Sequence, residues 1–349
     1  MRFDAIVGNP PYQMADGGAL DSAKPIYNLF IENAKKIKPK YISMIVPARW
    51  MTGGKGLDGF RDRMIHDTHI RALFDYASSK NLFNDVDVRG GICYFLRDEN
   101  YNNECFCVRY DCDGKTESRR NLCEGDGDIF IREPLLVGIK KKVDDKSADK
   151  LFRIDFARNA YGLQGETTRN ASKFGLPEFS DNEIEDGYKI LGLDEKGHRC
   201  WKYLPKDYPI PRKNEGLDKY KVFIVKSPGC RGIGEVPSTP VLSTPVLSTP
   251  GELCTETFLQ IGPFETKIEA ENLLKYIKTK FFRALVGIKK QTQQAARKVY
   301  QYVPIENFTQ ISDIDWTKSI SEIDQQLYKK YGLSQDEIDF IESKVQEMR

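Results

Sequence analysis

Histidine is scarce in this sequence, and both long hydrophobic runs and a strong net charge are absent from it. Its three histidines, His66, His69 and His198, are not clustered, so nothing in the sequence indicates catalysis by histidine. The longest apolar stretches, residues 41–47 and 281–288, are far too short to span a bilayer, so no contact with a membrane is expected. The net charge is only +2, so any surface that binds nucleic acid must be formed by a local cluster of cations.

A secretory signal is also missing, because residues 3–8 already have the pattern of a core strand and no cleavage site follows them. Eight cysteines in a chain of 349 residues without such a signal indicate reduced thiols and a cytoplasmic protein. Four of them lack the paired Cys-x2-Cys spacing of common zinc sites. We interpret these four as strand thiols and expect no metal site: Cys105, Cys107, Cys112 and Cys123.

The most informative motif is Asn9-Pro10-Pro11-Tyr12, which directly follows the apolar run of residues 3–8. The two prolines fix φ near about −65° and remove two backbone donors, so the turn is stiff and its carbonyls stay free. The Asn9 side-chain oxygen and the Pro10 carbonyl can each accept one hydrogen of an exocyclic amine, while Tyr12 stacks on the ring that carries this amine. The alternative is that the four residues form only a turn.

This motif resembles the catalytic Asn/Asp/Ser-Pro-Pro-Tyr/Phe motif of the methyltransferases that modify adenine in DNA. The resemblance implies that S-adenosylmethionine donates the methyl group and that the target adenine is flipped out of double-stranded DNA to expose its 6-amino group. It also implies that the catalytic residues are Asn9, Pro10, Pro11 and Tyr12.

By the same resemblance, the strand after Gly90 and Gly91 lines the other side of the flipped base. Tyr94 or Phe95 is therefore a candidate for the second wall of the base pocket. Side chains alternate along a strand, so one of the two must face the core, and a packing role for both is an equally good interpretation.

Strands and helices alternate up to about residue 110, which indicates an α/β fold with a mostly parallel sheet. In the family, the glycine-rich turn that binds S-adenosylmethionine lies well upstream of the catalytic motif, whereas only eight residues precede Asn9 here. We therefore expect residues 1–143 to be the C-terminal half of the catalytic domain, with an incomplete doubly wound sheet. The expected strands are residues 3–8, 41–47, 70–76 and 91–97, and the expected helices are residues 25–37 and 57–66, with a hairpin or excursion at residues 101–132.

Family order places a DNA target-recognition domain after the catalytic strand, and residues 144–310 are loop-rich, as expected of an irregular α+β domain. Weak candidates for DNA contacts within it are Arg158, Tyr161, Gly162, Lys226 and Thr255. Capping-box spacing predicts a helix from Thr266 to about Lys290 and a C-terminal helical hairpin in residues 311–349, broken at Gly332.

The strongest charge feature lies between Asn272 and Ile305, where no acidic residue occurs. A helix there would bury its apolar stripe and point its cations outward, which favours contacts with DNA phosphates and base edges, although a solvated face is the plainer alternative. A glycine-rich loop with Lys55 lacks the spacing of a phosphate-binding loop but could touch DNA. The candidate DNA-contacting residues are Lys55, Lys280, Lys289, Lys290, Gln291, Gln293, Arg297 and Lys298.

The order of these parts resembles the C-terminal portion of a type II restriction–modification adenine methyltransferase of the fused type IIG kind. The resemblance implies a site-specific enzyme that would need the missing cofactor-binding half, supplied by a separate polypeptide, to be active. Two alternatives remain: a DNA-recognition (specificity) module without catalysis, and a part of a fused restriction endonuclease–methyltransferase.

Overall fold

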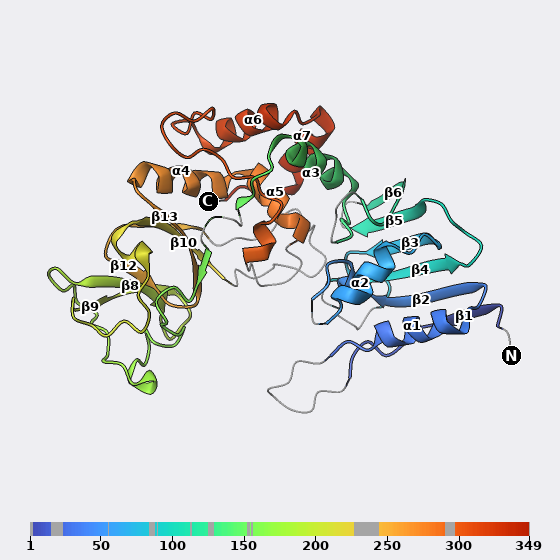
Figure 1. The fold of residues 1–349 in the computed structure, drawn as a ribbon, viewed down its shortest axis with the longest axis horizontal. Helices are drawn as coiled ribbons and strands as arrows, with labels where there is room; N and C mark the ends of the chain where they lie inside the picture. Colours follow the sequence, from blue (N-terminus) through green and yellow to red (C-terminus); the bar gives the residue numbers. More distant parts are fainter. Residues whose placement is uncertain are drawn as a thin grey trace. The chain divides into compact units, whose positions relative to one another are not determined.

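The computed structural model describes residues 3–14, 24–54, 56–83, 88, 90–111, 114–124, 129–151, 154, 156–226, 244–289 and 297–348 (Figure 1). The chain divides into two compact units. Among the described residues, the first unit extends to residue 138 and the second begins at residue 139.

The first unit is built on a six-stranded sheet of order β1-β2-β4-β3-β5-β6. Its strands are Ala5–Gly8 (β1), Tyr41–Pro47 (β2), Ile70–Tyr76 (β3), Ile92–Asp98 (β4), Cys105–Asp111 (β5) and Gly114–Arg120 (β6). The four strands expected from the sequence are therefore present, and the expected hairpin is formed by β5 and β6.

The expectation of a mostly parallel sheet is wrong. β1 is parallel to β2, and β3 is parallel to β5, but β4 lies between β2 and β3 and is antiparallel to both. The connection from β3 to β4 contains no crossover helix among its described residues, only the short 3-10 helix Ser79–Asn81 (η2). A strand that is joined to its neighbour by a short connection without a crossover helix pairs antiparallel to it, so β4 is antiparallel to β3 and the sheet is mixed.

Helices α1 (Tyr27–Ile37) and α2 (Asp58–Ile65) cover one face of this sheet. Alternate residues of β2 are buried against them, and Trp50, in the 3-10 helix Ala48–Met51 (η1), is fully buried in the same core. α2 begins after a glycine-rich loop and ends at His66. Helix α3 (Pro134–Lys146) follows the sheet.

The second unit contains two small sheets, one of order β11-β10-β13-β7 and one of order β12-β8-β9. A shared hydrophobic core joins them. The strands are Phe156–Arg158 (β7), Tyr188–Leu193 (β8), Arg199–Leu204 (β9), Tyr220–Val225 (β10), Val246–Ser248 (β11), Glu252–Cys254 (β12) and Phe258–Phe264 (β13). Single-turn 3-10 helices lie at Ser172–Phe174 (η4), Glu215–Asp218 (η5) and Arg297–Tyr300 (η6).

Four helices complete the second unit: Lys267–Lys278 (α4), Lys280–Lys289 (α5), Ile320–Tyr331 (α6) and Gln335–Lys344 (α7). All three predicted capping boxes are formed, and Gly332 ends α6 in the left-handed conformation. The single helix predicted from Thr266 to Lys290 is interrupted at Thr279, which is extended and ends α4. Among the described residues, no helix is long and apolar enough to cross a membrane.

Candidate active site

The Asn9-Pro10-Pro11-Tyr12 segment directly follows β1, so it lies at the carboxyl end of this strand, beside β2. Asn9 is exposed, Pro10 is buried and Tyr12 is half-buried. The segment thus presents an accessible side-chain amide next to an aromatic ring that is partly enclosed by protein.

Backbone pairing fixes the position of Tyr12. Its carbonyl accepts a hydrogen bond from the Ile26 N–H at 3.2 Å, and Gln13 pairs with Pro25 in an antiparallel bridge at the entry to α1. The Tyr12 hydroxyl oxygen is buried and has no hydrogen-bond partner within the part of the chain that the structure describes. Burial, and secondarily the nearby Cys93 of β4, raise the pKa of this hydroxyl. The hydroxyl therefore keeps its proton.

A glycine turn approaches the same edge of the sheet. The Gly91 carbonyl accepts a hydrogen bond from the Ala48 N–H at 3.0 Å, directly after β2 ends. Gly91 has φ +84°, and a Cβ atom added to it would lie 2.1 Å from the Tyr76 carbonyl oxygen. Only glycine fits at this close approach of two backbone segments.

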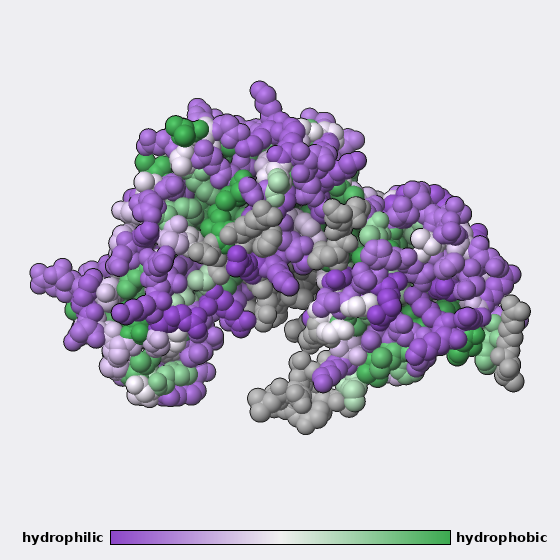
Figure 2. Space-filling model, viewed as in Figure 1, coloured by the Kyte–Doolittle hydropathy of each residue, from purple (hydrophilic) through white to green (hydrophobic). Residues whose placement is uncertain are grey.

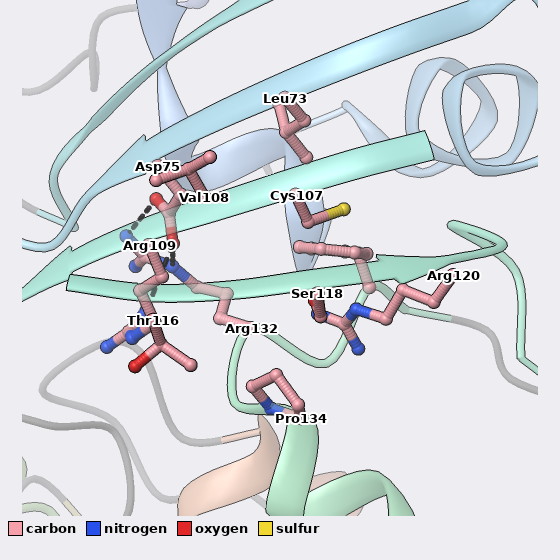
Figure 3. A pocket seen from close by; sticks show the side chains of 11 residues that line it. Leu73, Asp75, Cys107, Val108, Arg109, Thr116, Ser118, Arg120, Arg132 and Pro134 are labelled. Atoms are coloured by element: carbon pink, nitrogen blue, oxygen red, sulfur yellow. Dashed lines mark hydrogen bonds and ion pairs between the residues drawn. The ribbon is translucent and has the colours of Figure 1, made fainter. Parts of the chain in front are cut away.

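A buried ion cluster, which the sequence analysis missed, braces this turn. The Arg132 guanidinium donates from Nε to Oδ2 of Asp75 at 2.7 Å and from Nη1 to the Gly90 carbonyl at 2.8 Å. Arg109 donates to the same Asp75 carboxylate at 3.0 Å. Figure 3 shows the three side chains converging beside Pro134, around a cavity of about 10 Å³ that has room for no more than one water molecule. The cluster is a support for the Gly90 turn and not a ligand pocket.

The two candidates for the second wall of the base pocket lie on opposite faces of β4. Phe95 is fully buried in the core on the face that α1 and α2 cover, where no base can reach it. Tyr94 is half-buried on the other face, and its ring stacks on Phe74 with 4.5 Å between the centroids. Of the pair, only Tyr94 is left as a candidate.

The predicted outward-facing basic helix is wrong. All residues from Phe281 to Ile288 in α5 are buried, including Arg283. α6 and α7 pack on α5, and the Asp324 carboxylate of α6 accepts hydrogen bonds from the Lys280 and Phe281 N–H groups at the start of α5. Lys280 Nζ forms an ion pair with Glu342 at 2.5 Å, so this ammonium is held within the helix packing.

The other candidate DNA contacts are divided between exposed and partly buried positions. Arg297 and Lys298 are exposed on the short helix η6, whereas Lys289 is half-buried and donates to Gln301 at 2.8 Å. Lys55, Lys290, Gln291 and Gln293 lie outside the described residues.

The weaker candidates in the second unit also differ in exposure. Arg158 is exposed and Lys226 is half-buried, but Tyr161 and Thr255 are fully buried. The Tyr161 hydroxyl donates to Gln260 at 2.7 Å. Gly162 adopts φ +75° in a tight turn. Tyr161, Gly162 and Thr255 therefore have structural roles, and Arg158 is the accessible cation of this group.

Comparison with known proteins shows what part of the chain is similar to. Residues 1–83 match the family model described as the Eco57I restriction-modification methylase. The chain is 32% identical over 163 residues to an uncharacterized adenine-specific methylase of Mycoplasma pneumoniae. Over part of its length, the chain is similar to adenine-specific restriction–modification methylases. The alignment covers 43% of this chain and 39% of that relative, so the chain spans well under half of the methylase's length.

The solved structure of a restriction–modification enzyme, MmeI, has a similar fold. The type IIL enzyme MmeI, solved in complex with DNA, has a TM-score of 0.53 and 10% identity, covering 97% of this chain and 56% of that chain. The type IIG restriction endonuclease BpuSI has a TM-score of 0.38 and 14% identity, covering 93% of this chain and 48% of that chain. At these identities the likeness to MmeI concerns the fold alone.

Proposed function

We propose that this chain forms the base-binding and target-recognition part of a site-specific adenine DNA methyltransferase of a restriction–modification system. One observation carries the proposal: an exposed Asn9 and a half-buried Tyr12 flank a diproline turn at the carboxyl end of β1, within the residues that match the methylase family. The modified group is the 6-amino group of a flipped adenine.

The chemistry follows from the two acceptors of the turn. The lone pair of adenine's amino group is delocalised into the ring, so the nitrogen is a poor nucleophile. Hydrogen bonds to the Asn9 side-chain oxygen and the Pro10 carbonyl favour a more tetrahedral nitrogen, while stacking on Tyr12 holds the base in place. The base must leave the duplex to reach such a turn.

In the family that the motif resembles, the glycine-rich turn that binds S-adenosylmethionine lies upstream of the catalytic motif. β1 is an edge strand of the described sheet, and Val7 on it is 78% exposed. Leu29, Phe30 and Ile37 of α1 are also exposed, as the hydrophobic patches over α1 and β1 in Figure 2 show. An uncovered apolar edge of this kind is typical of a surface that another segment covers. We propose that a cofactor-binding polypeptide segment pairs along β1.

DNA recognition is assigned to residues 144–310, followed by the helices of residues 311–349. The cations that lie exposed in the described part of this region include Arg158, Arg297 and Lys298, and these are the proposed phosphate contacts. The solved complex of MmeI with DNA, whose fold covers nearly this whole chain, supports DNA as the partner.

The test is methylation of host DNA in a strain without adenine methyltransferases. The chain is expressed together with the polypeptide that carries a glycine-rich cofactor turn, and N6-methyladenine is read by single-molecule sequencing, which requires no knowledge of the target. We expect Asn9→Ala to reduce modification at least about a hundredfold, as for loss of one transition-state hydrogen-bond group. Gln13→Ala, an exposed neighbour, serves as the control and should not change it.

The alternative, a specificity module without catalysis, makes the opposite prediction. In that case Asn9→Ala leaves both methylation and DNA binding as they are, because another polypeptide carries the base-binding turn. Unchanged modification by the Asn9→Ala variant would therefore remove the catalytic assignment and leave the DNA-recognition role.

A further inference from the structure

A second pocket in the first unit lies at the edge of the sheet opposite to Asn9. It has a volume of about 240 Å³ and is lined by residues that precede β3 and β5 or follow β6, among them His66, Asn103, Asn121 and Cys123. Asn9 follows the carboxyl end of β1, and β1, β2, β3 and β5 all run in the same direction, whereas this pocket is at their amino ends. The pocket is therefore distinct from the proposed base-binding site.

The pocket contains a thiol–imidazole pair. Cys123 Sγ lies 3.3 Å from Nε2 of His66, and Nδ1 of the same ring lies 2.8 Å from the Asp62 carbonyl oxygen. A ring nitrogen that faces a carbonyl oxygen must carry the hydrogen, so Nε2 is the acceptor and the Cys123 thiol is the donor. The hydrogen bond to the backbone thus sets the ring to take a proton from Cys123.

The charged groups around this pair are few. His66 caps the C-terminus of α2, and its Nδ1 also lies 3.4 Å from the Asp62 carboxylate. The other charged groups nearby already have partners: Asp67 pairs with Lys35 and Arg97, and Arg120 pairs with Glu124. Proton transfer from Cys123 to His66 therefore creates an ion pair that these neighbours do not oppose.

The remaining described cysteines have less favourable environments. Cys93 and Cys254 are fully buried, and burial raises the pKa of both thiols, that of Cys93 to about 12. Cys105 and Cys107 are buried in the core, where a reagent cannot reach them, although a hydrogen bond with Cys105 and the nearby Arg120 lower the pKa of Cys107. Cys200 is half-buried like Cys123, but its surroundings raise its pKa, with burial as the main cause. Among the six described cysteines, Cys123 is therefore the best nucleophile.

We propose that Cys123 is a reactive thiol that forms a mixed disulfide with a small polar disulfide held in this pocket. His66 takes the thiol proton, Cys123 Sγ attacks one sulfur of the bound disulfide, and the bond between the two ligand sulfurs breaks. The departing thiolate takes the proton from His66 and leaves as a thiol, so one protein thiol is oxidised and one ligand sulfur is reduced. The side-chain amides of Asn103 and Asn121 offer polar contacts to the ligand.

The pocket is large enough for this role. Its volume corresponds to about eight water molecules, which accommodates one half of a disulfide such as cystine. Within the described residues, no group of three His, Cys, Asp or Glu side chains could hold a metal ion, so the pair is not part of a metal site there. These observations favour a covalent thiol reaction over ion binding.

The experiment treats the full chain with 5,5′-dithiobis(2-nitrobenzoate) or cystine at pH 6, where an ordinary thiol is almost fully protonated. The release of aromatic thiolate is followed by absorbance, and the modified peptide is identified by mass spectrometry. We expect a fast phase that maps to Cys123, disappears in Cys123→Ser and slows about tenfold in His66→Gln. Cys200→Ser is the matched control and should leave the fast phase intact.

Two outcomes would overturn the proposal: a fast phase that maps to another cysteine, or an unchanged rate in His66→Gln. Unfolding of the His66→Gln variant cannot mimic the expected result, because it would expose the buried thiols and accelerate their modification. Circular dichroism of the variant provides a second check on its fold.

Discussion

The ion cluster of Asp75, Arg109 and Arg132 makes a quantitative prediction about which of its two arginines stabilises the first unit. Arg132 donates to both oxygens of Asp75 and to the Gly90 carbonyl, whereas Arg109 makes one hydrogen bond, to Asp75. Nε and Nη2 of Arg109 have no hydrogen-bond partner within the described residues, and the further ion pairs of Nε, with Asp111 at 3.8 Å and Glu133 at 3.9 Å, are too long to be hydrogen bonds. We therefore expect the substitution Arg132→Met to be much more destabilising than Arg109→Met.

The magnitudes follow from burial. All three side chains are at most 6% exposed, and removing one partner of a buried ion pair costs about 3–5 kcal/mol. Arg132→Met also removes the repulsion that, after burial, contributes to lowering the pKa of Arg109. We thus expect a loss of about 3 kcal/mol for Arg132→Met. Arg109→Met leaves Asp75 bound to Arg132, so it should lower the free energy of unfolding by only about 1 kcal/mol.

Urea unfolding measures both values. The chain has three tryptophans, and Trp50 lies in the first unit, so a background of Trp201→Phe and Trp316→Phe makes the fluorescence report this unit alone. With an m-value of about 2 kcal/mol per M, Arg132→Met shifts the midpoint by about 1.5 M and Arg109→Met by about 0.5 M. Equal shifts, or a larger one for Arg109→Met, would refute this account of the cluster.

Two further substitutions test other parts of the fold. Gly91→Ala places a Cβ atom against the Tyr76 carbonyl and should lower the free energy of unfolding by at least about 2 kcal/mol in the same urea assay. Gly90 also has a positive φ, but a Cβ atom added there would have no atom within 4 Å, so Gly90→Ala should lower the free energy of unfolding by only about 1 kcal/mol. Burial lowers the pKa of Lys221 to about 8, whereas an unfolded lysine has a pKa of about 10.4. Between pH 8 and pH 10.4 the unfolded chain therefore binds one more proton than the folded chain, so the free energy of unfolding rises with pH in this range. Unfolding curves at pH 7 to 10 should show a gain of up to about 3 kcal/mol that is absent from Lys221→Met; parallel curves for the two proteins would contradict it.

The sequence predicts those features of the site that depend on local chemistry. Two consecutive prolines fix their own φ angles, and an apolar run before them makes a strand, so the turn at Asn9 could be placed without tertiary information. Gly91 could be anticipated for the same reason, since a positive φ is a property of the residue itself. The catalytic role of Asn9 remains a prediction, and its position at the end of β1 is what the structure adds.

Features that depend on distant partners could not be predicted. Asp75 meets Arg109 and Arg132 across separations of 34 and 57 residues, and each of the three is an ordinary charged residue in its own segment. The insertion of β4 between β2 and β3 likewise depends on pairing across the sheet. A signal did exist for the cluster, because Asp75 and Arg109 interrupt strands that are otherwise mostly apolar or aromatic, and a buried charge in a strand needs a partner.

The basic segment shows why local charge counts mislead. No acid occurs between Asn272 and Ile305, yet Lys280 is paired with Glu342, and the backbone at the start of α5 is capped by Asp324. Both acids come from helices more than forty residues further along the chain, which cover α5 and bury its cations. A segment rich in cations therefore indicates a DNA-binding face only where acidic residues from other segments do not pair with those cations in the folded protein. Lys298, which is exposed on η6, is the cation of this segment to test first for binding to DNA.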